Sequence, residues 1–363
     1  MFLFKNFVVL AAMALVTACV AAPEPQRRPP VFIPAPRHQM PPPPTTRPPG
    51  RRSTGMNTAG LTQAIRSLWV GFDGRAGISI MPLDNSWTVS QRGDEPMPQQ
   101  SVSKLWVALT FLSAVDAGRF KLSDTVTLTK SDLTLFHQPI AEDIGDGGYT
   151  TTLSELLERA MTQSDNTCND YLLRKVGGPD AVRAFLASKG LTGIKFGPGE
   201  KYLQAGTAGL TWRPEYTEAR RFQAARAQLT PDARLAAFER YAADPVDGAT
   251  PNGIARGLIK LKRGELLSLD STARLLSLMA ASETGKLRLH AGVPPGWGFA
   301  HKTGTGQDLK GRTAGYNDIS IMTAPDGTTY AVVVQIADTR RPIPERQAFM
   351  QGISSSVAAY HGN

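Results

Sequence analysis

Strand-like alternation of apolar and polar residues occurs near the two ends of the chain's larger part, and helical periodicity fills the span between them. One alternating stretch covers residues 77–90 around the turn Asp84-Asn85, and the other covers residues 317–337 around Asp326-Gly327. Each stretch predicts a β-hairpin. Because strands at both ends with helices between them are typical of a sheet packed by helices, the two hairpins are expected to share one antiparallel sheet.

Helices are expected between and beside these hairpins. The segments with a helical pattern are 58–70, 103–117, 152–163, 181–189, 251–262, 271–282 and 345–360. The sequence therefore predicts an α+β fold, in which an antiparallel sheet built from N- and C-terminal segments is packed by helices and joined to an all-helical subdomain. This unit is expected to cover residues 56–363.

Residues 1–22 have the pattern of an export signal, in which Lys5 precedes a short apolar run that ends in small residues. Residues 16–19 (VTAC) resemble a bacterial lipobox, in which the cysteine, here Cys19, is acylated and becomes the mature N-terminus. Ordinary cleavage at residues 21–22 is the alternative. Val20, and not an aspartate, follows the cysteine. In lipoproteins of Gram-negative bacteria, this pattern resembles that of proteins sorted to the outer membrane. We therefore expect an exported, periplasmic protein tethered to that membrane.

A proline-rich segment, residues 23–55, separates this signal from the expected domain. It holds 12 prolines between Pro23 and Gly50, which fix φ and remove backbone donors, so extended polyproline II is expected. About 30 residues in this conformation reach on the order of 90 Å. A spacer that lifts a domain off a membrane is the expected role, with a P-x-x-P interaction motif as the alternative.

The net charge of +9 would suit a nucleic-acid-binding protein, but its location argues against one. Seven basic residues and one acid lie in residues 1–52, which therefore carry +6, and the remaining 311 residues carry +3. No nucleic-acid partner is expected. The five histidines show no ligand-like pair, and Cys168 stands alone beyond the signal segment, so no metal or other cofactor is expected.

Ser101 and Lys104 form an S-x-x-K motif at the start of an expected helix. A spacing of three places the hydroxyl and the amine on the same helical face, one turn apart. A serine hydroxyl is a weak nucleophile, and an adjacent amine can take its proton. Taken alone, the pair is equally compatible with an exposed helix N-terminus and an ordinary lysine.

Two further motifs follow in the chain. Ser164-Asp165-Asn166 comes directly after an expected helix and could by itself be a cap and turn. Residues 301–306 (HKTGTG) could by themselves be an edge strand with a protective lysine. In the functional interpretation, Lys302 with two threonines and close-approach glycines forms a strand edge that binds a carboxylate. The ordered set of three motifs is more informative than any of its members.

The ordered motifs resemble those of the penicillin-recognising serine enzymes, most closely the class A β-lactamases. The likeness extends over residues 58–361, apart from one insertion. Residues 130–133 resemble the segment before the family's aromatic gate, which places Phe136 or His137 at the mouth of the pocket. The resemblance implies the β-lactamase/transpeptidase-like fold, a monomeric serine hydrolase and a small β-lactam substrate.

Class A enzymes carry E-x-x-L-N on an Ω loop, 36 residues after the serine of S-D-N. The same count from Ser164 reaches Glu200, at the start of EKYLQ. The resemblance thus makes Glu200 the base that activates the deacylating water, whereas a surface glutamate is the alternative. Gln204 replaces the family's asparagine and adds a methylene beside that water. Residues 212–215 (WRPE) are a rival for the loop, which would put Arg213 at the glutamate's position.

The chain has about 34 more residues between Glu200 and Lys302 than a typical class A member has. The extra residues are expected within 205–247, as amphipathic helices over 216–228 and 232–243. Such an insertion could widen the pocket, cover it or bind a partner.

The resemblance also implies catalytic roles. Ser101 would attack the β-lactam carbonyl, while Lys104, or Glu200 through a water, takes the serine proton. The backbone N–H groups of Ser101 and Thr305 would form the oxyanion hole. Ser164 would pass a proton to the leaving nitrogen, and Glu200 would then activate water to release the acyl-enzyme.

The resemblance also implies a second set of residues, which would bind the substrate. These residues are Asn166, Lys302, Thr303, Gly304 and Thr305. The asparagine would bind the amide of the substrate's side chain, and the lysine and threonines would hold its carboxylate. For the family's auxiliary carboxylate-binding arginine, Arg312 and Arg340 are both candidates.

Two other functions are compatible with the sequence. A D-Ala-D-Ala carboxypeptidase or transpeptidase uses the same serine, lysine and carboxylate grip without an efficient deacylating glutamate. A non-catalytic wall-binding lipoprotein could retain the fold. The role of Glu200 discriminates the first from a β-lactamase, and acylation of Ser101 discriminates the second.

Overall fold

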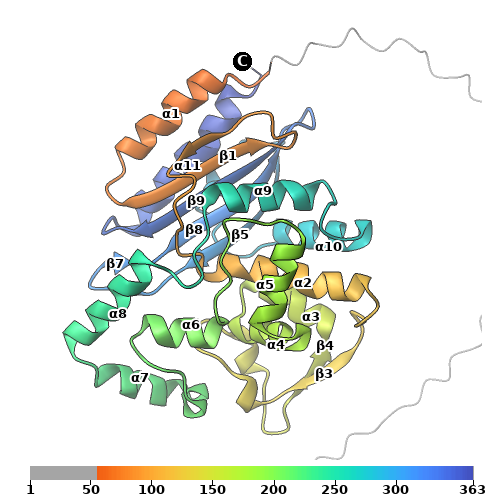
Figure 1. Cartoon of the computed structure of the whole chain (residues 1–363), viewed down its shortest axis with the longest axis vertical. Helices are drawn as coiled ribbons and strands as arrows, with labels where there is room; N and C mark the ends of the chain where they lie inside the picture. Colours follow the sequence, from red (N-terminus) through yellow and green to blue (C-terminus); the bar gives the residue numbers. More distant parts are fainter. Residues whose placement is uncertain (1–54, 363) are drawn as a thin grey trace, which may run out of the picture. The chain divides into compact units, whose positions relative to one another are not determined.

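The computed structural model describes residues 55–362 of the chain (Figure 1). The expected export signal, lipid attachment at Cys19 and all but the last residue of the proline-rich tether lie outside the described residues. Between residues 55 and 362, no helix combines the length and the apolar character needed to cross a membrane.

A five-stranded antiparallel sheet, in the order β2-β1-β9-β8-β5, joins the two ends of the described chain. Its strands are β1 (Arg75–Pro82), β2 (Val89–Gln91), β5 (Gly298–Thr305), β8 (Tyr316–Thr323) and β9 (Thr329–Asp338). Both predicted hairpins are present, as β1–β2 and β8–β9. Ile78 pairs with Val334 where the two hairpins meet, so the single sheet expected from the terminal segments is confirmed.

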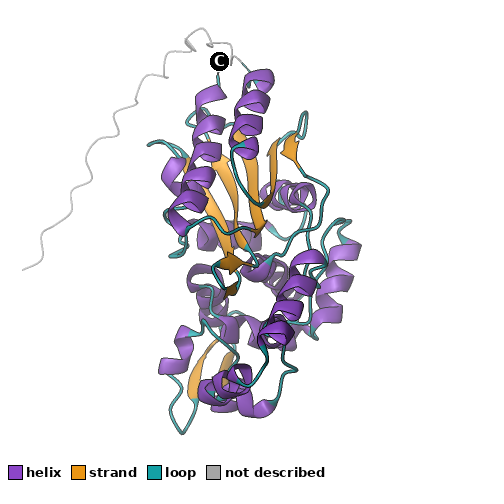
Figure 2. Cartoon of the chain, turned by 90° about the vertical axis from the view of Figure 1, so that its left-hand side faces the viewer, coloured by secondary structure: helices purple, strands orange, loops and turns teal. Residues whose placement is uncertain are grey.

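The sheet separates two apolar cores because successive residues of a strand point to opposite faces. Val332 and Val334 of β9 lie in the core on one face, and Val333 lies in the core on the other. The helices that cover the sheet are α1 (Thr58–Val70) and α11 (Ile343–Tyr360) on the first face, and α9 (Pro251–Lys262) and α10 (Leu269–Ala280) on the second. Figure 2 shows α1 and α11 side by side against the strands.

A largely helical part adjoins the second face. Its helices are α2 (Lys104–Asp116), α3 (Leu153–Glu158), α4 (Asn166–Val176), α5 (Pro179–Ser188) and α6 (Glu200–Thr207). Every residue from Lys104 to Leu112 is buried, because α2 is apolar around almost its whole circumference and is surrounded by the other helices. The central helix of the fold therefore begins at one of the predicted site residues.

This part is not wholly helical, which corrects the expectation of an all-helical subdomain. A two-stranded ribbon pairs β3 (Thr125–Leu128) with β4 (Tyr149–Thr152). Each strand has only four residues, and the long connection between them lacks the two-residue turn by which a hairpin is recognised in a sequence.

The helices expected between residues 205 and 247 are present. They are α7 (Ala219–Ala227) and α8 (Pro231–Ala243), preceded by a 3₁₀ turn at Pro214–Thr217. Phe222 of α7 packs in one cluster with Ala205 of α6, and Phe238 of α8 packs in another with Leu203 of α6. The insertion therefore lies directly against the helix that begins with Glu200.

Candidate active site

Ser101 lies in a 3₁₀ turn, Gln100–Ser103, that leads directly into α2. The three-residue spacing brings the buried Lys104 Nζ to 2.6 Å from Ser101 Oγ. Gln100, directly before the serine, has a φ of +54°, in the left-handed region that few non-glycine residues adopt. Such a conformation persists because surrounding contacts hold it, and it fixes the direction in which the next residue presents its side chain.

Lys104 Nζ has three oxygen partners. Beside Ser101 Oγ, it donates to Asn166 Oδ1 at 2.8 Å and to a carboxylate oxygen of Glu200. The glutamate is 2% exposed, so lysine and glutamate form a buried ion pair whose mutual attraction offsets the cost of removing both charges from water. The structure thus brings together four residues from three separate segments.

Asp170 fixes the start of α6 and thereby the position of Glu200. Its carboxylate accepts the backbone N–H of Glu200 at 2.8 Å and that of Lys201 at 3.1 Å, two donors left free at a helix N-terminus. Burial and the neighbouring charge of Glu200 raise the pKa of this carboxyl group. Asp170 was not among the predicted site residues.

Ser164 lies opposite Ser101 and meets the second buried lysine. Lys302 Nζ donates to Ser164 Oγ at 2.9 Å and to the backbone oxygen of Thr303 at 3.1 Å. Burial lowers the pKa of Lys302 well below its usual range, and the positive charges of Lys104 and Arg288 lower it further. Ser164 itself caps the preceding helical turn with a φ of +64°, so the cap-and-turn interpretation also holds.

The strand β5 is at the edge of the sheet, as the third motif predicted, and it presents Thr303 and Thr305 to the pocket. Thr303 Oγ1 lies 2.7 Å from Thr284 Oγ1. Gly304 lies against the turn that carries Ser101: a Cβ atom at this position would be 2.3 Å from the backbone oxygen of Gln99. Only glycine allows this approach of two backbones.

Arg288 borders the pocket beside β5, and neither of the two candidates named from the sequence borders it. Its guanidinium donates to Thr305 Oγ1 at 2.5 Å and to the backbone oxygens of Gly304 and Asn317. Burial lowers the pKa of Arg288. Arg312 instead binds Asp338, and Arg340 donates to the backbone of Lys310. Neither Arg312 nor Arg340 therefore contacts the pocket in which the substrate carboxylate is expected.

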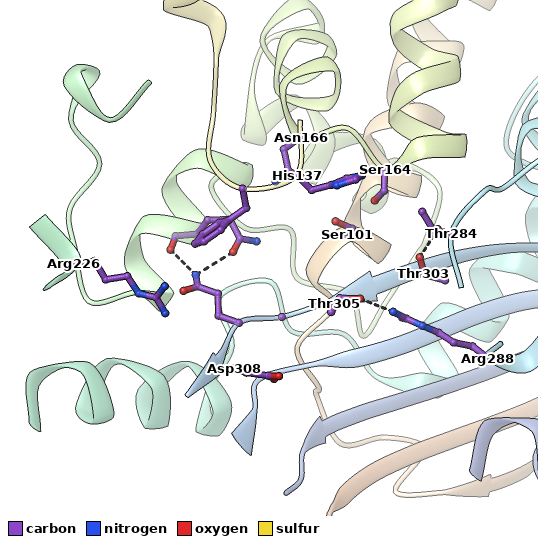
Figure 3. A pocket seen from close by; sticks show the side chains of 14 residues that line it. Ser101, His137, Ser164, Asn166, Arg226, Thr284, Arg288, Thr303, Thr305 and Asp308 are labelled. Atoms are coloured by element: carbon purple, nitrogen blue, oxygen red, sulfur yellow. Dashed lines mark hydrogen bonds between the residues drawn. The ribbon is translucent and has the colours of Figure 1, made fainter. Parts of the chain in front are cut away.

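A pocket of about 470 Å³ lies over these groups, and Figure 3 shows its lining. Ser101, Ser164 and Asn166 border it directly, whereas Lys104, Lys302 and Glu200 are buried beneath its wall. Both candidates for the aromatic gate border the pocket. These are Phe136 and His137, and the phenyl ring is 42% exposed.

The rival loop lies outside this pocket. Arg213 is exposed and Glu215 is half-buried at the 3₁₀ turn that precedes α7, with 3.8 Å between their charged groups. Cys168 is buried and burial raises the pKa of its thiol, which keeps it protonated and unreactive. Within residues 55–362 there is no cluster of three acidic, histidine or cysteine side chains that could hold a metal ion.

One family profile, that of the β-lactamase enzyme family, matches residues 60–361. The chain belongs to this family. β-Lactamase VEB-1 of Pseudomonas aeruginosa is 26% identical over 309 residues, which are 84% of this chain and 92% of the relative. β-Lactamase CTX-M-4 of Salmonella typhimurium is 29% identical over 290 residues, which are 78% of this chain and 85% of the relative.

Solved β-lactamase structures share the fold. The TLA-1 extended-spectrum β-lactamase has a TM-score of 0.69 at 26% identity and covers 84% of this chain and 98% of its own. An ancestral class A β-lactamase has a TM-score of 0.65 at 29% identity, and the match covers 82% of this chain and 99% of the ancestral chain. The predicted α+β fold and the class A resemblance are confirmed, and the chain is a serine hydrolase of the class A β-lactamase type.

Gln204 marks where this β-lactamase departs from the motif of its family. Its Nε2 donates to Glu200 Oε2 at 3.3 Å and to Gln100 Oε1 at 3.1 Å, while Gln307 Nε2 donates to its backbone oxygen at 2.9 Å. The added methylene lets one amide reach both the glutamate and the residue before Ser101. The glutamine therefore couples α6 to the turn that carries the serine.

The insertion of this β-lactamase reaches the same turn. Tyr241 of α8 accepts from Gln100 Nε2 at 2.7 Å and donates to Asp247 Oδ1 at 3.0 Å. Asp247 Oδ2 in turn accepts the backbone N–H of Gln100 at 2.8 Å. These buried contacts hold Gln100 in its left-handed conformation through both its backbone N–H and its side-chain amide. Neither Tyr241 nor Asp247 was predicted, since the sequence pattern of α8 indicates only an amphipathic helix.

Proposed function

We propose that the chain hydrolyses the amide of β-lactams through an acyl-enzyme on Ser101, and that water activated by Glu200 releases the product. The observation that carries this proposal is the position of Lys104 Nζ, which contacts both Ser101 Oγ and the carboxylate of Glu200. A peptidase of the same superfamily needs the first contact but has no use for a buried glutamate beside it.

In the acylation step, Ser101 Oγ attacks the carbonyl carbon of the strained ring. Lys104 is the group in contact with this oxygen, and transfer of one of its protons to Glu200 leaves a neutral amine that can accept the serine proton. A water between Glu200 and the serine would serve the same purpose. Negative charge then develops on the carbonyl oxygen, which the N–H groups of Ser101 and Thr305 would stabilise.

The ring nitrogen leaves with a proton that Ser164 Oγ passes to it, and the proton released by Ser101 then replaces it on Ser164, which returns Glu200 to its charged form. Lys302 supports this step because it donates to Ser164 Oγ and therefore favours release of the serine's own proton. The substrate carboxylate would bind at Thr303, Thr305 and Arg288, whose hydroxyls and guanidinium border the pocket. Asn166 would bind the amide of the acyl side chain.

In the deacylation step, Glu200, again in its charged form, takes a proton from a water that attacks the ester carbonyl, and this proton passes to Ser101 Oγ as the ester bond breaks. Gln204 Nε2 donates to the second oxygen of this carboxylate. This hydrogen bond fixes the orientation in which the glutamate would meet the water. General-base catalysis of this kind contributes about 10²- to 10⁴-fold to a rate.

The test compares Glu200→Gln with the wild type on a chromogenic cephalosporin. The variant keeps the size of the side chain but lacks the base, so we expect steady-state turnover to fall about 10²- to 10⁴-fold. Intact-protein mass spectrometry should show the acyl adduct accumulating on Ser101. Glu215→Gln, in the rival loop, is the matched control and should keep wild-type turnover.

Undiminished turnover by Glu200→Gln would show that another group activates the water. A stable penicilloyl adduct on the wild type, without turnover, would favour the carboxypeptidase instead. No adduct on Ser101 at all would favour the wall-binding lipoprotein.

We further propose that the protein is exported to the periplasm and attached to the outer membrane through an acylated Cys19, with residues 23–55 as a spacer. The lipobox-like VTAC sequence supports this proposal. In a Gram-negative host, the wild type should incorporate labelled palmitate and fractionate with the outer membrane. Cys19→Ser should do neither, and a wild type found free in the periplasm would contradict the proposal.

A further inference from the structure

Arg226 borders the pocket from the insertion. It lies in the last turn of α7, and Figure 3 shows its side chain reaching toward the pocket from the side opposite Arg288, with Ser101 between them. The pocket therefore has a guanidinium at each end. One belongs to the segment before β5, and the other belongs to a segment in which this chain is longer than a typical class A member.

The two arginines differ in their partners. Arg288 is committed to three acceptors, whereas no acid or other hydrogen-bond acceptor contacts Arg226 in the part of the chain that the structure describes. Among residues 55–362, the Nε atoms of both arginines are buried without a partner, but only Arg288 has acceptors for its other guanidinium nitrogens. Asp308, the acid in the same pocket wall, lies 3.9 Å from Arg346 instead.

The surroundings of Arg226 also disfavour its charged form. Burial lowers its pKa, and so does the positive charge of Arg234 from α8. An unpaired cation that is half buried beside a second cation destabilises the folded protein. Its neighbour Arg221, by contrast, has Glu218 at 2.8 Å. A bound anion would supply the partner that Arg226 lacks.

We propose that Arg226 forms an anion subsite for the acyl side chain of the substrate, so that the enzyme favours β-lactams with a carboxylate on that side chain. This inference rests on the proposed function, which assigns the ring carboxylate to the Arg288 end of the pocket. Asn166 would hold the side-chain amide, and the remainder of the acyl group then extends toward Phe136 and Arg226. Phe136 contacts Phe222 of α7 edge-on, at 5.5 Å between ring centroids, and so joins the gate to the insertion.

The test uses two penicillins that differ by one carboxylate on the acyl side chain, carbenicillin and benzylpenicillin. The measured quantity is the ratio of their kcat/KM values. We expect Arg226→Gln to lower this ratio at least tenfold, and Arg226→Lys to retain more of it because the charge remains. The ratio for the wild type should also fall with rising ionic strength.

Arg220→Gln is the matched control, since it removes the same charge from an exposed position of the same helix and should leave the ratio unchanged. A ratio unaffected by Arg226→Gln would overturn the subsite. If neither penicillin is turned over, the proposed function fails, but the ratio of the two rates of Ser101 acylation still tests the subsite by the same comparison. Melting temperatures identify any variant that fails to fold.

Discussion

At the residue scale, the two buried lysines divide the work of the site by their partners. Lys104 contacts the serine and the glutamate, whereas Lys302 contacts Ser164 and the strand that is proposed to bind the substrate carboxylate. They are also coupled, because the charge of Lys104 is one cause of the lowered pKa of Lys302. The pKa of Lys302 therefore depends on the charge of Lys104.

The lowered pKa of Lys302 predicts a pH dependence. A lysine whose pKa lies below its usual range loses its charge at a lower pH, so kcat/KM for benzylpenicillin should decline on the alkaline side before an ordinary lysine would titrate. Lys302→Arg keeps the charge at every accessible pH, so its alkaline decline should move upward even if the absolute rate falls. The measurement is kcat/KM between about pH 6 and pH 10.

Lys195→Arg serves as the control for this profile, since Lys195 is exposed, lies 3.2 Å from Asp244 and does not border the pocket. Its profile should coincide with that of the wild type. Identical alkaline limbs for Lys302→Arg and the wild type would remove Lys302 from the titration.

At the element scale, the insertion supports the site as well as bordering it. Helix α8 contributes Tyr241, which binds both Gln100 and Asp247, and helix α7 contributes Arg226 to the pocket. Burial raises the pKa of Asp247 to about 6, while the hydroxyl of Tyr241 and the N–H of Gln100 act against this rise. The hydroxyl thus stabilises the charged carboxylate on which the Gln100 backbone depends.

Tyr241→Phe should weaken this support. Loss of one buried hydroxyl leaves polar partners unsatisfied, which costs about 1–3 kcal/mol of unfolding free energy at neutral pH, measured by urea denaturation. The pKa of Asp247 should rise further, because a hydrogen bond to its charged form is gone. We expect acylation of Ser101 by a chromogenic cephalosporin to slow about tenfold, equivalent to about 1.4 kcal/mol.

Tyr202→Phe is the matched control, since Tyr202 of α6 is half exposed and should change neither quantity. A Tyr241→Phe variant with wild-type stability and acylation would show that the Gln100 conformation does not need the insertion.

At the scale of the whole molecule, the site lies where the sheet meets the helical part. Lys302 and Thr305 come from edge strand β5, whereas Ser101 comes from the turn before the central helix. The two backbones meet at Gly304. The oxyanion hole proposed above would use one N–H from each side, so its geometry depends on how closely the two parts approach.

Gly304→Ala should separate them. The added Cβ would meet the backbone oxygen of Gln99 at 2.3 Å, so β5 must move away from the turn. We expect kcat/KM per folded molecule to fall about 100-fold, since a displacement near 1 Å at a reacting centre has this effect. Gly60→Ala is the comparison, because its Cβ would meet the Tyr360 ring at 2.4 Å, between helices α1 and α11, and neither residue borders the pocket.

Both glycine variants should lower the melting temperature, but only Gly304→Ala should lose activity beyond its loss of folded protein. Equal losses of activity in the folded fraction would mean that the junction at Gly304 does not set the catalytic geometry.

The sequence predicts the parts of this molecule that depend on neighbours in the chain. The hairpins were recognisable because apolar alternation and turn residues are local, and the meeting of Ser101 with Lys104 follows from helical spacing alone. The count of 36 residues from Ser164 reached Glu200, which is buried and accepts a hydrogen bond from Lys104. Its catalytic role stays a prediction.

The residues that were missed depend on contacts between distant segments. Arg288 and Arg226 reach one pocket from opposite sides, yet each stands in an unremarkable stretch of sequence. Asp170 lies one helical turn past a recognised motif, but its role depends on where α6 begins. The β3–β4 ribbon escaped because its strands are short and widely separated.

The pairing of β1 with β9 also dictates the order in which the molecule can assemble. Ile78 has no lateral partner on that side until Val334 has been synthesised, and closing so long a loop before it gains contacts slows folding. Residues 298–305 join the sheet only through β8, the neighbour of β9. Nearly the whole polypeptide must therefore be available before the strand bearing Lys302 can join the sheet, so catalytic competence requires the C-terminal strand β9.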